Sequence, residues 1–343
     1  MACSALRLEA APASLDVQLL RAVSTGNMKT VQSLIKKGAK VNARNTDGTT
    51  PLILAARQNS LPLVDFLLKH GADARARDKA GVSCLGYQPA LAESLWKRGA
   101  RATPSDAAIL SDYLEELIDS DRKDKDVEAK ARMLVRVGMN LNTIGPGDTG
   151  VTPLISAIDS RPSLVPLLLS LGADPNLIDF HGRTPLIATI EPTTASDEDE
   201  EPASLTLLKH GAKLDAGDSF DTTALMMALL GGRFTLAREL ISRGAKVNSK
   251  DKWGQTALMC AAARGSGEMV RLLLDSGADP KLKNFQGKTA LVYAQSQGEY
   301  SELVGLTLSF SSAKEYQRQV TEGQQLKGRK EIQAMLQEKP KSK

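Results

Sequence analysis

Aromatic side chains are scarce in this chain, in which Phe, Trp and Tyr together make 13 of 343 residues. Hydrophobic residues nevertheless make 42% of the sequence and charged residues 24%, a mixture that excludes a disordered or collagen-like polymer. A large core built around aromatic rings is excluded as well. The abundant Leu and Ala side chains instead favour thin layers of helices packed through small aliphatic groups.

Long apolar runs and cysteine clusters are also missing. The longest apolar stretch lies near residues 224–230, far short of the roughly 18 residues that a membrane-spanning helix needs. The first 14 residues contain Arg7 and Glu9 and lack the apolar segment of a secretory signal. Three scattered cysteines, Cys3, Cys84 and Cys260, fit neither a disulfide framework nor a metal knuckle. These absences favour the cytoplasm, with the nucleus as an alternative.

The net charge of +4 has a definite location in the sequence. Residues 314–343 contain eight basic and four acidic side chains, which leaves 36 of each sign in the rest of the chain. The balance therefore predicts a basic tail, and it gives little support to a basic face that binds nucleic acid.

Two motifs recur in phase along most of the chain. Gly-Ala pairs begin at positions 38, 71, 99, 172, 211, 244 and 277, with Gly138-Met139 at the remaining place, at spacings of 28 to 39 residues. A second motif has the form Gly-x-Thr-Pro/Ala-Leu and begins at Gly48, Gly150, Gly182, Gly254 and Gly287. Such periods indicate a repeat architecture.

Each motif has a physical meaning. Threonine before proline is typical of a helix start, because the hydroxyl accepts from a free backbone N–H group and proline lacks the N–H that would stay unpaired. Leucine runs followed by glycine, as in Leu272 to Gly277, indicate the end of a second helix. The polar stretch that follows predicts a turn, so the unit is turn, helix, helix.

These motifs strongly resemble those of the ankyrin-repeat family, over residues 16–306. The resemblance implies an all-α fold, a solenoid of about eight to nine stacked turn-helix-helix units in which neighbours bury a shared core. Residues 1–15 would be an N-terminal tail and residues 307–343 a partly helical basic tail. In that tail, Ile332, Met335 and Leu336 share a helical face. A helix that caps the array, a solvated helix and a nuclear-import or partner-binding signal remain alternatives for it.

The sequence departs from the family pattern in three respects. The family's His after Pro-Leu is replaced by apolar residues, which predicts apolar packing instead of polar links between repeats. The motifs decay over residues 81–141, where we expect helices that stack irregularly. An acidic insertion at residues 192–202 predicts a solvated loop. Within this insertion Ser196 precedes Asp197-Glu198-Asp199 and is a candidate phosphorylation site, with a merely solubilising loop as the alternative.

We find no arrangement of residues typical of catalysis, and we predict no catalytic, cofactor or metal site. Gly287-Lys288-Thr289 lacks the earlier glycine of a phosphate-binding loop. His70 and His210 precede helix-ending glycines, where an imidazole interacts favourably with the helix end. Cys84 and Cys260 lie on first helices, where we expect inert packing.

The resemblance implies a non-enzymatic interaction scaffold, monomeric by itself, that binds a protein or peptide partner on a concave surface of turn tips and first helices. An adaptor that recruits a catalytic complex is the leading alternative. An enzyme and a nucleic-acid-binding protein are less favoured, and a membrane partner is not expected.

Four aromatic rings align on successive turn tips and suggest the binding face. Phe180, Phe220, Trp253 and Phe285 lie one or two positions before Gly182, Asp221, Gly254 and Gly287. We expect these rings to anchor a partner. The alternative is that they pack on adjacent turns and stiffen them. The flanking polar residues that would select the partner are His181, Arg183, Lys252, Gln255 and Lys288.

Overall fold

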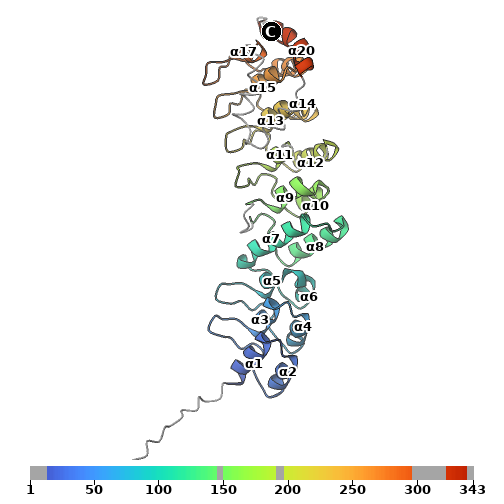
Figure 1. Ribbon diagram of the computed structural model, residues 1–343, viewed down its shortest axis with the longest axis vertical. Coiled ribbons are helices and arrows are strands. Elements are labelled where there is room, and N and C mark those ends of the chain that lie inside the picture. Colours follow the sequence, from blue (N-terminus) through green and yellow to red (C-terminus); the bar gives the residue numbers. More distant parts are fainter. Residues whose placement is uncertain (1–13, 145–149, 191–196, 296–321, 338–343) are drawn as a thin grey trace, which may run out of the picture. The chain divides into compact units, whose positions relative to one another are not determined.

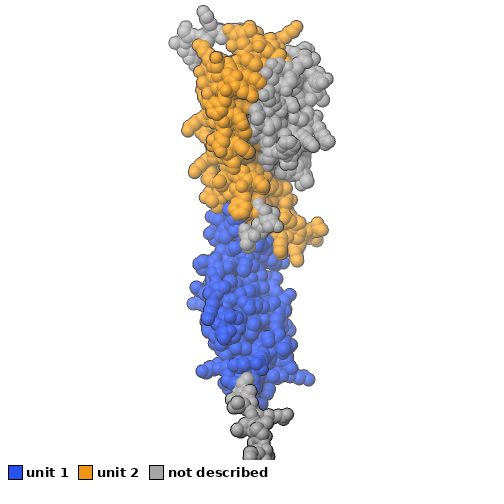
Figure 2. Space-filling view, turned by 60° about the vertical axis from the view of Figure 1, so that its left-hand side comes forward, with its two compact units in different colours: residues 1–114, 125–146 blue, residues 115–124, 147–343 orange. Residues whose placement is uncertain are grey.

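The computed structural model describes residues 14–144, 150–190, 197–295 and 322–337, and within these ranges the regular structure is helical (Figure 1). Two isolated antiparallel bridges, Arg77 to Ser83 and Gly217 to Thr223, join the two sides of individual turns. The predicted all-α architecture of turn-helix-helix units is confirmed. The chain divides into two compact units, which are coloured separately in Figure 2.

Unit 1 comprises residues 1–114 and 125–146. Helix α3 packs against its partner α4 and against the first helices of both neighbouring repeats, α1 and α5. The helices with residues in this unit are α1 (Leu15–Ser24), α2 (Met28–Lys36), α3 (Pro51–Arg57), α4 (Leu61–Lys69), α5 (Cys84–Tyr87), α6 (Ala92–Lys97), most of α7 (Ala107–Ile118) and most of α8 (Asp124–Arg136), with the 3-10 turns η1 (Pro89–Leu91) and η2 (Pro104–Asp106).

Unit 2 comprises residues 115–124 and 147–343. Its first helices contact one another in sequence order, α9 to α11 to α13 to α15 to α17, and second helices pack beside them. Its helices are α9 (Pro153–Ser160), α10 (Val165–Ser170), α11 (Pro185–Ala188), α12 (Asp197–Lys209), α13 (Ala224–Gly231), α14 (Phe234–Ser242), α15 (Ala257–Arg264), α16 (Gly267–Asp275), α17 (Ala290–Gln295) and α20 (Glu322–Gln337), with the 3-10 turn η3 (Pro162–Leu164).

Helix α20 lies against the last repeat of unit 2, where it contacts α17, α16 and α15. Ile332 is fully buried and Leu336 is buried, as their shared face suggests. The Gln333 amide donates to the carbonyl of Ala294 over 3.2 Å. Glu331 pairs with Arg271 of α16 at 2.9 Å. This segment of the basic tail therefore covers the end of the repeat stack.

Helix starts follow the predicted chemistry. The hydroxyls of Thr50, Thr152 and Thr184 each accept from the N–H three residues on, over 3.2 to 3.3 Å, and the next residue is proline. Second helices end at glycine, as at Gly277, whose φ of +88° suits a residue without a side chain. There the N–H of Ala278 donates to the carbonyl of Leu273 over 2.9 Å and closes the helix.

Turn geometry depends on one Asn or Asp in each regular repeat. The Oδ1 atom of Asp251 accepts from the N–H groups of Trp253 and Gln255 over 2.9 and 2.8 Å. In other turns, too, an Oδ1 atom accepts from the N–H groups two and four residues further on. These turns begin at Asn45, Asp179, Asp218 and Asn284. These bonds make the turns ordered parts of the repeat.

First helices stack through apolar residues, as the loss of the family's His predicts. Ile53, Ile155, Ile187, Met226 and Met259 occupy the His position and are at most 1% exposed. Apolar packing at this position is confirmed.

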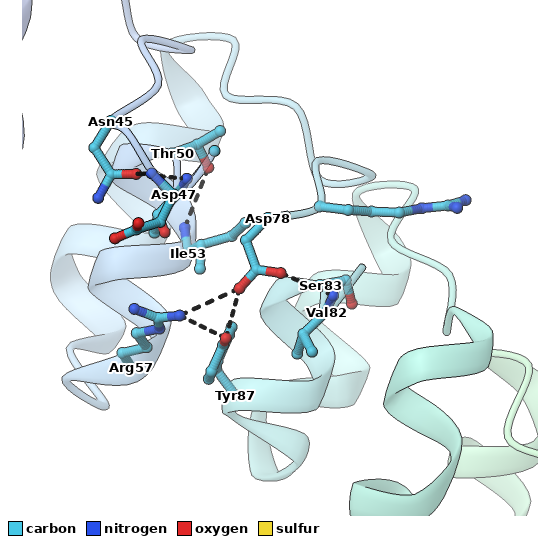
Figure 3. A network of polar contacts seen from close by, with 12 residues as sticks. Asn45, Asp47, Thr50, Ile53, Arg57, Asp78, Val82, Ser83 and Tyr87 are labelled. Carbon is cyan, nitrogen blue, oxygen red and sulfur yellow. Dashed lines mark hydrogen bonds and ion pairs between the residues drawn. The ribbon is translucent and has the colours of Figure 1, made fainter. Parts of the chain in front are cut away.

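Polar links between repeats are nevertheless present, and they come from other positions (Figure 3). Arg57 at the end of α3 lies 4.1 Å above the Tyr87 ring and donates to the Tyr87 hydroxyl and to Asp78. The Tyr87 hydroxyl donates to Asp78 Oδ2 over 2.6 Å. Burial raises the pKa of Asp78, but the bonds from Tyr87, Val82 and Ala80 and the charge of Arg57 outweigh it, so that the pKa lies below 3.8.

A buried carboxylate organises the stretch in which the repeat motifs decay. Asp106 is fully buried and accepts three hydrogen bonds, from the N–H and hydroxyl of Ser83 and from the N–H of Thr103, over 2.6 to 2.8 Å. A methyl group on Gly86 would lie 2.3 Å from its Oδ1 atom. Asp106 therefore links its own irregular repeat to the preceding one, whose first helix, α5, has only four residues.

Leu273 on α16 is fully buried between helices, and we predict that Leu273→Ala lowers the free energy of unfolding by about 2 to 5 kcal/mol through lost burial and cavity formation. Urea unfolding followed by circular dichroism measures this change. Leu272→Ala on the same helix, where the side chain is half-buried, is the matched control and should cost less. Equal losses in the two variants would contradict this packing.

Asp251 makes the stability of unit 2 depend on pH. Its Oδ2 atom is buried and has no hydrogen-bond partner. Burial raises the pKa of Asp251 from 3.8 to about 6, and the negative charges of Asp218 and Asp221 act in the same direction. Because the folded chain holds this proton more tightly than the unfolded chain, the contribution to stability is complete below pH 3.8 and is lost as pH rises through about 6.

We therefore predict that Asp251→Asn increases the free energy of unfolding at about pH 8 by about 1 to 3 kcal/mol and leaves it nearly unchanged at about pH 4. Asparagine suits the site, because Asn45 and Asn284 accept the same two N–H groups in other repeats. Unfolding midpoints measured across this pH range provide the test. Asp47→Asn, at an exposed turn carboxylate, is the control. A gain that does not vary with pH would disprove the assignment.

Candidate protein-binding surface on the turn tips

Neighbouring turn tips in unit 2 are joined by backbone hydrogen bonds. The N–H of Phe180 donates to the carbonyl of Gly150 over 3.1 Å, and the N–H of Lys252 to that of Phe220 over 2.9 Å. The N–H of Phe285 likewise donates to the carbonyl of Trp253 over 2.9 Å. The tips that carry Phe180, Lys252 and Phe285 are thus each fixed to the tip before them, and their side chains are held at defined spacings.

The four aromatic rings predicted on these tips differ in exposure. Phe285 is 79% exposed and Phe180 is 72% exposed, whereas Phe220 is 42% exposed and Trp253 is half-buried. The rings of Phe220 and Trp253 lie 5.2 Å apart, centre to centre, with planes inclined by 34°. This pair packs across two neighbouring tips and stiffens them, while Phe180 and Phe285 present most of their surface to solvent.

The two exposed rings are positioned by glycines of the preceding turn. A methyl group on Gly150 would lie 1.9 Å from the Phe180 ring, and one on Gly254 would lie 3.2 Å from the Phe285 ring. The absence of a side chain at each glycine leaves room for the ring edge against the backbone. The rings therefore contact the backbone of the preceding turn and expose most of their surface to solvent.

Ile178 belongs to the same apolar surface, although the analysis of the sequence did not single it out. It is 51% exposed and precedes Phe180 by two residues. Buried Asp179 separates these two exposed apolar side chains in the sequence. This alternation was the signal in the sequence that would have identified Ile178.

The polar residues predicted to flank the rings are partly exposed to solvent and partly held by contacts within the protein. His181 and Lys252 are exposed, and Lys252 Nζ donates to the carbonyl of Ser219 over 2.6 Å. Arg183 is half-buried between Asp179 and Asp159, at 2.7 and 3.1 Å. Lys288 Nζ lies 5.9 Å from the centre of the Tyr293 ring.

Gln255 is fully buried, and its side-chain amide has no hydrogen-bond partner. It therefore does not lie on the exposed tip surface. His181 and Lys252 are the predicted flanking residues that do lie there.

His70 and His210 lie at helix ends, and Cys84 and Cys260 are buried. Nδ1 of His70 lies 2.8 Å from the Phe66 carbonyl oxygen, and Nδ1 of His210 lies 2.9 Å from that of Thr206. Burial raises the pKa of the Cys84 thiol to about 12 and that of Cys260 well above its usual value, so both stay protonated.

Among the residues that the structure describes, no group of His, Cys, Asp or Glu side chains is placed to hold a metal ion. Within the same ranges, no helix is long and apolar enough to cross a membrane. Ser196, the candidate phosphorylation site, lies outside the described residues.

Proteins of several kinds resemble parts of this chain. A putative ankyrin repeat protein of fowlpox virus is 29% identical over 177 residues, which are 51% of this chain and 93% of the viral protein. The 2-5A-dependent ribonuclease of Mus musculus is 42% identical over 69 residues, and the potassium channel AKT2/3 of Arabidopsis thaliana is 30% identical over 200. These matches cover 20% and 55% of this chain but 9% and 23% of the relatives.

Among solved structures, the human ASB11 ankyrin repeat domain matches 80% of this chain and 89% of its own, with 22% identity and a TM-score of 0.36. A sequence profile described as ankyrin repeats (3 copies) matches residues 18–89, 163–251, 194–284 and 235–307, more than half of the chain. Together with the paired helices and ordered turns, this match shows that the chain belongs to the ankyrin-repeat family.

Proposed function

We propose that this protein is a non-enzymatic scaffold whose unit 2 binds a protein partner through its turn tips. The observation that carries the proposal is the pair of exposed rings, Phe180 and Phe285, on tips fixed by backbone bonds. Large rings on a rigid support are the side chains that dominate protein interfaces, because little conformational freedom is lost on binding.

The surrounding residues supply what such an interface needs besides an anchor. Ile178 extends the apolar surface beside Phe180. His181 and Lys252 add polar groups at the edge, where they select a partner more than they strengthen its binding. The Phe220–Trp253 pair holds two intermediate tips together. An adaptor that recruits a catalytic complex would use the same surface. The two roles differ only in whether the bound partner belongs to a catalytic complex.

We predict that Phe180→Ala and Phe285→Ala each weaken partner binding by about 1 to 4 kcal/mol, while the melting temperature changes little. A partner purified with the full chain from its native cells provides the ligand, and calorimetry of the purified pair gives Kd. Leu61→Ala, which removes an apolar side chain of 42% exposure from unit 1, is the control and should bind normally.

Trp253→Ala should behave differently, because the indole is half-buried against Phe220. We expect it to lower the melting temperature as well as the affinity. Unchanged affinity in both phenylalanine variants, or a loss of stability without a loss of binding, would exclude the tips as the binding surface.

A further inference from the structure

The balanced charge outside the basic tail conceals a strong segregation of charge. Residues 36–101 contain twelve basic and five acidic side chains, whereas residues 102–242 contain twelve basic and 23 acidic ones. The overall charge balance, which gives little support to a basic face that binds nucleic acid, is the sum of these opposite regions. Residues 36–101, which carry the local excess of basic side chains, belong to unit 1.

The basic residues gather on the segments that connect α2 to α3 and α4 to α5 in unit 1. We define the basic patch by five exposed side chains: Lys40, Arg44, Arg75, Arg77 and Lys79. In the second segment, exposed Arg75, Arg77 and Lys79 alternate with less exposed residues, of which Ala74 and Ala76 are buried. Arg75 and Lys79 lie in the turns at the two ends of this stretch, and all three cations are exposed to solvent.

Hydrogen bonds hold the two segments side by side. Asn42 Nδ2 donates to the carbonyl of Gly71 over 3.1 Å, and Asn42 Oδ1 accepts from the N–H of Asp73 over 2.8 Å. Further along, the N–H of Lys79 donates to the carbonyl of Asp47 over 2.9 Å. The cations of the two repeats therefore form one surface.

Two of the arginines are oriented by the backbone. Arg44 Nη1 donates to the carbonyls of Gly48 and Arg77 over 2.7 and 2.6 Å, and Arg75 Nε donates to the carbonyl of Gly99 over 3.2 Å. A guanidinium has five N–H donors, so each keeps others for a ligand. Holding the group in place in advance lowers the entropy lost when a ligand binds.

In the described part of unit 1, the five patch cations make no ion pair with a carboxylate. The ion pairs there join Arg57 to Asp78, Lys97 to Glu93 and Arg98 to Asp65, and none includes a residue of the basic patch. Arg183 of unit 2, by contrast, lies between two carboxylates. The positive charge of the patch is therefore open to a negatively charged partner.

We propose that the basic patch binds an extended acidic segment of a partner protein, with carboxylates paired to its arginines. The guanidinium fork matches a carboxylate with two parallel hydrogen bonds. Asp47 and Asp73 are exposed beside the patch and would repel a uniformly charged phosphate backbone, whereas a peptide can place a neutral or basic residue there. The large exposed apolar residues of unit 1 in the described ranges are Leu15, Val17 and Leu61, so the patch lacks an exposed ring on which a base could stack.

The test uses the full chain and a fluorescent peptide of about ten residues that alternates Glu and Ser, with Gln in place of Glu as the neutral control. We expect anisotropy to show binding of the acidic peptide alone, with an affinity that falls as salt rises from about 50 to about 300 mM. A single-stranded oligonucleotide of similar charge should bind more weakly.

The variant Arg77→Glu/Lys79→Glu should weaken peptide binding at least about tenfold. Among the residues that the structure describes, neither side chain has a hydrogen-bond or ion-pair partner, so the fold should be retained, as circular dichroism will show. Arg132→Glu/Arg136→Glu reverses the same number of charges on α8 of unit 1, also at exposed residues, and should change the affinity less than about twofold.

Other outcomes would overturn the proposal. If Arg77→Glu/Lys79→Glu and Arg132→Glu/Arg136→Glu weaken peptide binding equally, the effect comes from net charge and not from a specific site. Lys250 and Lys283 of unit 2 occupy the repeat positions of Arg44 and Arg77. If only Lys250→Glu/Lys283→Glu weakens peptide binding, the binding site lies in unit 2. Tighter binding of the oligonucleotide would indicate a nucleic-acid surface. Phe180→Ala/Phe285→Ala should leave peptide binding unchanged, which separates this proposal from the function proposed for the tips.

Discussion

The repeats depend on one short-range interaction, in which an Asn or Asp oxygen accepts two backbone N–H groups of its own turn. This bond pattern fixes the turn that brings Thr to the helix start and presents the tip backbone to the next repeat. Without ordered turns the helices would have no common register. Where the turn residue is Asp, this arrangement buries a carboxylate, which is unfavourable. At Asp251 one carboxylate oxygen also has no hydrogen-bond partner.

Structural features that depend on residues close together in the chain could be predicted from the sequence. Thr-Pro at a helix start and glycine at a helix end act within a few residues, and both behave as expected. Apolar stacking at Ile53 and Ile187 also follows from the repeat phase. The position of the aromatic residues on the tips could be predicted in the same way.

Structural features that depend on a contact with a residue of another repeat could not be predicted. Asp106 is an ordinary turn residue in the sequence, and its role depends on Ser83, 23 positions earlier. The difference between Trp253 and Phe285 arises because Trp253 has a ring beside it on the preceding tip, whereas Phe285 follows a glycine-bearing turn. The basic patch was missed because a sum of charges contains no information about where they lie.

The two proposed surfaces differ in chemistry and lie on different units, so one partner can be bound through rings and another through ion pairs. Salt would weaken the second interaction far more than the first, since exposed charges are screened and apolar contacts are not. Membership of the ankyrin-repeat family indicates a protein-interaction module, and under the two proposals these side chains would give each unit its own selectivity.

The helix α20 has a consequence for how such a chain can change in length. It covers α17 and buries Ile332 against the last repeat, so that this face of the repeat is no longer available to a further one. A duplicated repeat added after Gln295 would have to displace α20, whereas one inserted between existing repeats would find a matching surface on each side. Growth of this protein by duplication is therefore restricted at one end and open in its interior.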